Sequence, residues 1–196
     1  MRKVALLAAL LGTGVLAVGA VAVADNDDGS SRDGARLNGY QEVSSVSTDG
    51  FGSFRLKVNR GGESVDYVLS YRGVEFDVTQ AHIHFAQRSV NGPIAVFLCA
   101  NGDFRMGQRA DLPTCPLREG TVEGTFQPSD LGATGRGLGP GSTAGEWEEL
   151  LAAIKVGHTY ANVHTGSAVA GFPGGEIRGQ INDRDQKEYT GPPLFD

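Results

Sequence analysis

The sequence predicts a mainly β protein, an antiparallel β-sandwich of about seven or more strands with one short helix. Three observations lead to this prediction. Glycine supplies 29 of the 196 residues, about twice its usual share, which favours many tight turns. Several segments alternate apolar and polar residues with period two. Strand-like and helix-like segments do not alternate along the chain, which argues against an α/β fold.

The clearest strands form a predicted hairpin. Every second residue is apolar from 53 to 58 and again from 65 to 71, and the turn-forming stretch Arg-Gly-Gly-Glu at 60–63 separates them. The continuous apolar run 94–99 suits a fully buried strand. The remaining predicted strands are 79–85, 121–126, 159–164 and 176–181.

One segment has helical periodicity. Thr143 and Glu146 form a capping box, and apolar residues follow at helical spacing from Trp147 to Ile154. Gly157 is a suitable stop. We therefore predict one amphipathic helix over about 144–156, packed on one side of the sheets.

The N-terminus predicts an extracytoplasmic location. Arg2 and Lys3 precede an uncharged apolar run that ends with Ala-Val-Ala at 22–24. We interpret 1–24 as a cleaved signal peptide, and an uncleaved membrane anchor is the alternative. Both place the remaining chain outside the cytoplasm. Residues 25–36 are predicted to be a flexible linker and 183–196 a flexible tail, which leaves one domain at 37–182.

The charge balance argues against nucleic acid as a partner. The chain has 17 Lys and Arg residues against 23 Asp and Glu residues, a formal net charge of -6, and no basic stripe. Cys99 and Cys115 are the only two cysteines. In an oxidising compartment we predict that they form a disulfide bond, with a metal-ligand pair or free thiols as the alternatives.

The histidines are the candidates for site chemistry. His82 and His84 are two residues apart on a predicted strand, so both face the side opposite Ala81 and Ile83. His164 ends another strand. If these strands are neighbours, three imidazoles converge, a set that suits copper or zinc with an open fourth position for water. The alternative is that they are hydrogen-bonding residues that order a polar surface.

Polar residues accompany the histidines on the same strands. Glu176 and Arg178 share a face of the last strand and predict an ion pair or a polar network across strands. Together with Gln80 and Asn162 they are expected beside the histidine site. No hydrolase, phosphate-loop or metalloprotease motif is present, and we assign no catalytic residue.

An ordered set of motifs resembles the CHRD domain family, named after chordin, in its single-domain secreted bacterial type. The motifs are LNGYQEV at 37–43, AHIHF at 81–85, NGPIAVFLC at 91–99, GEW at 145–147, YANVHT at 160–165 and FPGGEIRGQ at 172–180. The resemblance implies an extracellular, immunoglobulin-like β fold and no established enzyme activity. An insertion at 167–171 departs from the family pattern.

We expect a secreted or cell-envelope module with a binding or structural role and an unknown extracellular partner. We expect His82, His84 and His164 to bind one copper ion or, alternatively, one zinc ion. A mononuclear copper or zinc protein with redox activity, similar to a superoxide dismutase-type β-sandwich, is the alternative. A dinuclear dismutase site needs more histidines than the 4 present here.

Overall fold

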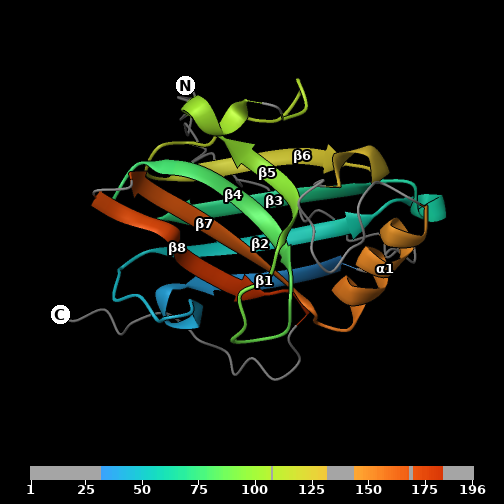
Figure 1. The fold of residues 1–196 in the computed structure, drawn as a ribbon, viewed down its shortest axis with the longest axis horizontal. Coiled ribbons are helices and arrows are strands. Elements are labelled where there is room, and N and C mark those ends of the chain that lie inside the picture. Colours follow the sequence, from blue (N-terminus) through green and yellow to red (C-terminus); the bar gives the residue numbers. More distant parts are fainter. Residues whose placement is uncertain (1–31, 107, 132–143, 168–169, 183–196) are drawn as a thin grey trace, which may run out of the picture.

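The computed structural model describes residues 32–106, 108–131, 144–167 and 170–182, which contain eight strands and one α-helix (Figure 1). The strands are β1 (Arg32–Asn38), β2 (Phe51–Val58), β3 (Val65–Arg72), β4 (Val78–Phe85), β5 (Ile94–Ala100), β6 (Gly120–Phe126), β7 (Thr159–Ser167) and β8 (Ala170–Gln180). The α-helix is α1 (Ala144–Lys155), and short 3₁₀ turns lie at Gly39–Gln41, Arg60–Gly62, Gly102–Arg105 and Pro128–Asp130. These elements confirm the prediction of a mainly β fold with one short helix.

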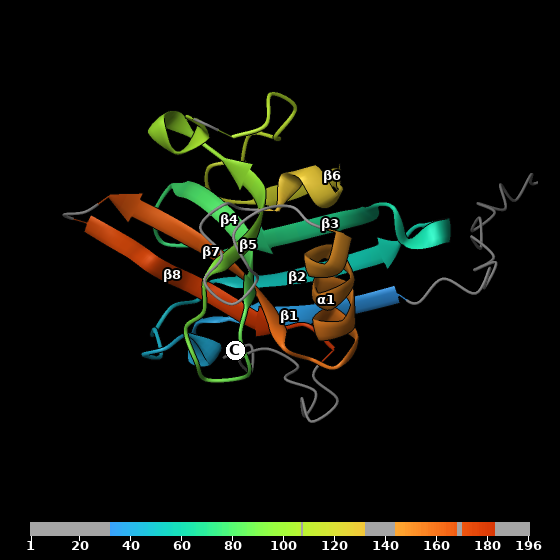
Figure 2. The same cartoon turned by 45° about the vertical axis from the view of Figure 1, so that its right-hand side comes forward.

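All strands belong to one antiparallel sheet, in the order β5-β4-β7-β8-β1-β2-β3-β6. The sheet curls over, so β4 and β5 cross in front of β2 and β3 (Figures 1 and 2). The Tyr67 hydroxyl of β3 donates a 2.5 Å hydrogen bond to the Leu98 carbonyl of β5 across this gap. The two layers expected of a sandwich are therefore two halves of one nearly closed sheet.

The predicted hairpin is present as β2 and β3. Their register pairs Phe54 with Leu69 and Lys57 with Asp66, so the apolar residues of both strands face inward. The same alternation places Ala81 and Ile83 of β4 in the core. The largest apolar side chains inside the curled sheet are Leu37, Phe54, Tyr67, Leu69, Ile83, Leu98, Phe126 and Ile177.

Helix α1 agrees with the predicted range 144–156. Leu150 and Ile154 are fully buried, one turn apart on the face that packs against the core. The Trp147 indole donates a hydrogen bond to the Gly62 carbonyl in the turn after β2, at 2.5 Å, and contacts Phe126 edge-on. Thr143 of the predicted capping box lies outside the described residues.

Strand β1 begins earlier than the sequence indicated. The prediction assigned 25–36 to a flexible linker, but Arg32–Asn38 pairs along its whole length with β2. Ala35 and Leu37 are buried, and the exposed Arg36 lies between them. The segment therefore has one side that faces the core, which its mostly polar composition did not indicate. The predicted signal peptide, the rest of the linker and the tail lie outside the described residues. Within the described ranges, no helix is long and apolar enough to cross a membrane.

The Cys99 and Cys115 sulfur atoms are 2.11 Å apart, so the predicted pair forms a disulfide bond between β5 and the loop before β6. The bond closes a loop with a sequence separation of 16 residues. We expect that changing both cysteines to Ser lowers the free energy of unfolding by about 3 kcal/mol, because the unfolded chain gains conformational entropy. Urea unfolding of the oxidised and double-variant proteins measures this difference. A loss below about 1 kcal/mol would contradict this chain-entropy argument.

Candidate metal centre

Strands β4 and β7 bring the three candidate histidines together. They are hydrogen-bonded neighbours, and their register pairs Gln80 with His164 and His82 with Asn162. His82 and His84 face away from the core, on the side predicted by strand alternation. The His164 side chain projects from β7 to the same side. The two strands are thus neighbours, as the predicted convergence of the three imidazoles requires.

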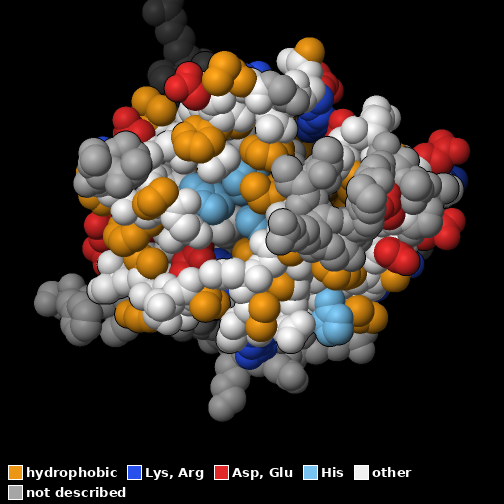
Figure 3. All heavy atoms as spheres, in the orientation of Figure 1, with side chains coloured by type: hydrophobic (Ala, Val, Ile, Leu, Met, Phe, Trp, Pro, Cys, Tyr) orange, Lys and Arg blue, Asp and Glu red, His pale blue; other side chains and the backbone are white. Residues whose placement is uncertain are grey.

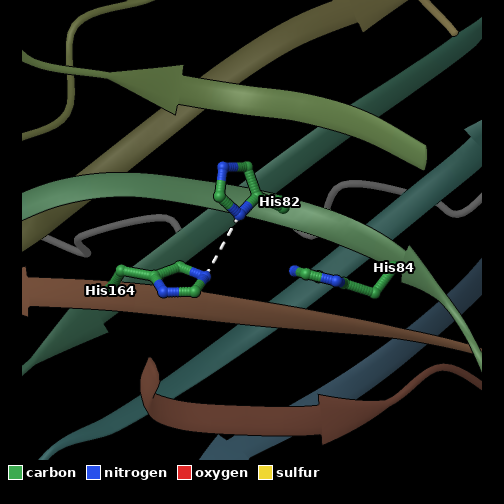
Figure 4. Close-up of side chains that lie close together, drawn as sticks. All are labelled: His82, His84 and His164. Carbon is green, nitrogen blue, oxygen red and sulfur yellow. Dashed lines mark hydrogen bonds between the residues drawn. The ribbon is translucent and has the colours of Figure 1, made fainter. Parts of the chain in front are cut away.

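The three imidazoles form one buried group. One nitrogen from each lies within 4.8 Å of the others, and His82 Nδ1 is 3.1 Å from His164 Nε2. Figure 4 shows one nitrogen of each ring directed into the same space. The exposed fractions are 0% for His82, 7% for His84 and 6% for His164. Such burial does not fit a solvated polar surface.

The outer nitrogen of each ring contacts a carbonyl oxygen. His84 Nδ1 lies 2.9 Å from the Gly92 oxygen and His164 Nδ1 lies 2.8 Å from the Pro173 oxygen. A backbone carbonyl can only accept, so both Nδ1 atoms carry the proton and both Nε2 atoms of the neutral rings present a lone pair. His82 Nε2 lies 3.0 Å from Gln80 Oε1. In the tautomer in which Nε2 donates to Gln80, Nδ1 presents an inward lone pair, and in the other tautomer Nδ1 donates to His164 Nε2.

Burial keeps the three rings neutral. It is the main cause that lowers the pKa of His82 well below 6.5, that of His84 to about 4, and that of His164. The positive charge that a neighbouring histidine would carry lowers the pKa of His82 and His84 further. All three are therefore neutral at pH 7, the form in which imidazole binds a metal.

The predicted polar neighbours Gln80 and Asn162 contact the histidines directly. Asn162 Oδ1 lies 3.1 Å from His164 Nε2. Arg178, on the next strand, lies with its guanidinium 3.4 Å from the centre of the Tyr160 ring, and Tyr160 stacks on His84 at 4.6 Å. Arg178 therefore supports the wall of the site through Tyr160.

These observations agree with the comparison to known protein families. The family model described as CHRD domain matches residues 34–181, a range that includes β4, β7 and the three histidines. The chain belongs to the CHRD domain family. No curated protein and no solved structure gave a match. The resemblance to the CHRD domain family, based on the sequence motifs, is thus confirmed.

In this CHRD domain, Glu176 does not pair with Arg178. Its carboxylate accepts hydrogen bonds from the hydroxyls of Thr48 and Thr165 and from the Glu75 backbone. Among the described residues, no ion pair joins Glu176 to Arg178. Thr165 is on β7, so Glu176 of β8 takes part in a polar network across strands, the second of the two predicted alternatives, and not in an ion pair with Arg178.

Glu42 is the site residue that the sequence reading missed. It is 6% exposed, and its Oε1 atom is buried with no hydrogen-bond partner. Burial raises its pKa to about 7, and the charge of Arg178 and the Asn162 amide partly oppose that rise. Glu42 follows the 3₁₀ turn Gly39–Gln41, where no periodicity marks a buried side. Its membership of the 37–43 motif was the only available signal.

The site lies near the surface of one face of the CHRD domain. Figure 3 shows a group of histidine side chains on this face with hydrophobic side chains around them. The exposed fractions of a few per cent agree with a site just below the surface.

Proposed function

We propose that this CHRD domain is a secreted or cell-envelope module that binds one metal ion through His82, His84 and His164, with copper as the ion and zinc as the alternative. The observation that carries the proposal is the set of fixed ring orientations. Three outer nitrogens face carbonyl oxygens, and three inner nitrogens converge, with lone pairs on Nε2 of His84 and His164 and, in the tautomer that donates to Gln80, on Nδ1 of His82. In that tautomer the inner lone pairs repel one another unless a cation lies between them.

This arrangement is the usual one for metal-binding histidines. A carbonyl or carboxylate partner on the far nitrogen fixes the ring and increases the basicity of the binding nitrogen. Imidazole is a preferred ligand of both copper and zinc, and the other donor at the site is an amide oxygen. The disulfide bond supports an oxidising compartment, where copper is a fitting ion.

The test is metal titration of the purified mature domain after removal of bound metal. We expect one Cu(II) or Zn(II) ion per chain and a higher unfolding temperature, because only the folded state assembles the site. Changing His82 or His164 to Gln removes one ligand and should weaken binding by at least about 100-fold.

His158 is the matched control. It is exposed and follows α1, outside the histidine group. His158→Gln should bind metal as the wild type does. A wild-type domain that takes up no stoichiometric metal, or His82→Gln and His158→Gln variants with equal affinity, would overturn the proposal.

A further inference from the structure

We infer that Asn162 supplies the fourth ligand through Oδ1, so that the site is closed and holds its divalent ion away from substrates. This inference rests on the proposed function and deepens it. It replaces the expectation of an open fourth position for water. Four-coordinate sites filled by protein ligands serve to hold a metal, whereas catalytic sites keep one position free.

The distances carry the first step. His164 Nε2 lies 3.1 Å from His82 Nδ1 and also 3.1 Å from Asn162 Oδ1. For metal–ligand distances near 2.0 Å, the ligand atoms of a tetrahedral site are about 3.3 Å apart. Both distances from His164 Nε2 are therefore close to the spacing of tetrahedral ligands. The largest spacing within the histidine group, 4.8 Å, requires a small inward movement of one ring.

The orientation of the Asn162 amide carries the second step. A Cβ atom added at Gly175 would overlap both Glu42 Oε1 and Asn162 Nδ2, so these two atoms meet above the same glycine. The Asn162 amide nitrogen thus faces the buried Glu42 carboxyl group, and the amide oxygen is directed toward the histidines. Glu42 is a positioning residue, because it acts on the site through Asn162.

The donor set also bears on the ion. Three neutral imidazoles and one amide oxygen contain no thiolate or thioether, the soft ligands that favour Cu(I). Nitrogen with a harder oxygen donor suits Cu(II) or Zn(II). The ligands are nine-tenths or more buried, and Asn162 itself is 2% exposed. A fourth protein ligand at this depth fills the tetrahedral position that water would otherwise take.

Azide binding to the Cu(II)-loaded full domain tests the inference. We expect no azide-to-copper charge-transfer band in the wild type, because no position is free. Asn162→Ala should still bind copper, with about 10-fold lower affinity, and should develop the band. Glu42→Leu removes the oxygen that the Asn162 amide nitrogen faces and should show a weaker band than Asn162→Ala. Asn59→Ala, in the turn before β3, is the matched control and should behave as the wild type does.

Asn162→Asp keeps the size of the side chain and an oxygen donor, so it should bind copper without an azide band even if Asn162→Ala folds poorly. A wild-type domain that binds copper and also azide, or an Asn162→Ala spectrum identical to that of the wild type, would overturn the inference while the proposed function stands. A wild-type domain that binds no metal would overturn both.

Discussion

Replacing Arg178 by Met is expected to destabilise the domain by about 3–5 kcal/mol, the range for breaking a buried charged network. Arg178 is 1% exposed, and its guanidinium donates to the Val90 carbonyl at 3.0 Å and lies on the Tyr160 ring. Methionine fills part of the volume but removes the guanidinium that donates to the Val90 carbonyl. It also removes the positive charge beside the buried Glu42.

Urea unfolding of three variants measures this effect. Arg178→Lys keeps the charge but not the planar donor group, so its stability should lie between those of the wild type and Arg178→Met. Arg55→Met, on the exposed side of β2, should change the free energy of unfolding by less than about 0.5 kcal/mol. An Arg178→Met loss below about 1 kcal/mol would show that the network contributes little to stability.

The parts of the fold that were predictable from the sequence are those that depend on local periodicity. Strand alternation correctly predicted the inward side of β2 and β3 and the common side of His82 and His84, because period two is a local property. Helix α1 was predictable for the same reason. Each of these features depends only on residues close together in the chain.

The depth of the histidines was not predictable from local patterns. Arg178 of β8 donates to the Val90 carbonyl of the loop between β4 and β5, and His84 bonds to Gly92 in the same loop. These contacts hold the loop over the outer face of the sheet. They join residues far apart in sequence, so alternation alone could not distinguish a buried site from a polar surface.

Glu42 and the curled sheet show the same limitation. Glu42 reaches the site only because β1 pairs with β8, which places the turn after β1 beside Asn162 and Arg178. The Tyr67 hydroxyl contacts the Leu98 carbonyl only because the sheet curls until β3, near one end of the strand order, faces β5 at the other end. Neither contact has a signature in the segments that make it.

The buried histidines should make the metal-free domain sensitive to acid. Each unfolded histidine gains a proton near pH 6.5, whereas the folded rings resist protonation, down to about pH 4 for His84. The unfolded state therefore binds more protons, and stability falls as the pH drops below 6.5. For each proton that the folded state excludes, the free energy of unfolding changes by about 1.4 kcal/mol per pH unit.

Glu42 acts in the opposite direction over the same range. Its folded pKa of about 7 lies above the unfolded value of 4.5, so its contribution is fully present below pH 4.5 and is lost as the pH rises through 7. Near pH 5.5 His82 and His84 exclude about two protons that the unfolded chain binds, and Glu42 retains about one. Unfolding therefore takes up at least about one proton, or about 1.4 kcal/mol per pH unit, and the lowered pKa of His164 adds to this uptake.

Urea unfolding of the metal-free domain from pH 5 to 8 measures the slope of the free energy of unfolding against pH. Glu42→Gln is the control that isolates the contribution of Glu42. Glutamine has the shape of the protonated glutamate but does not titrate, so the proton uptake on unfolding near pH 5.5 should rise by about one proton. His84→Gln should lower it by about one. A free energy of unfolding that stays flat between pH 6.5 and 5 would mean that the histidines accept protons in the folded state. The inward lone pairs would then be proton sites, and a bound metal ion would have to displace those protons.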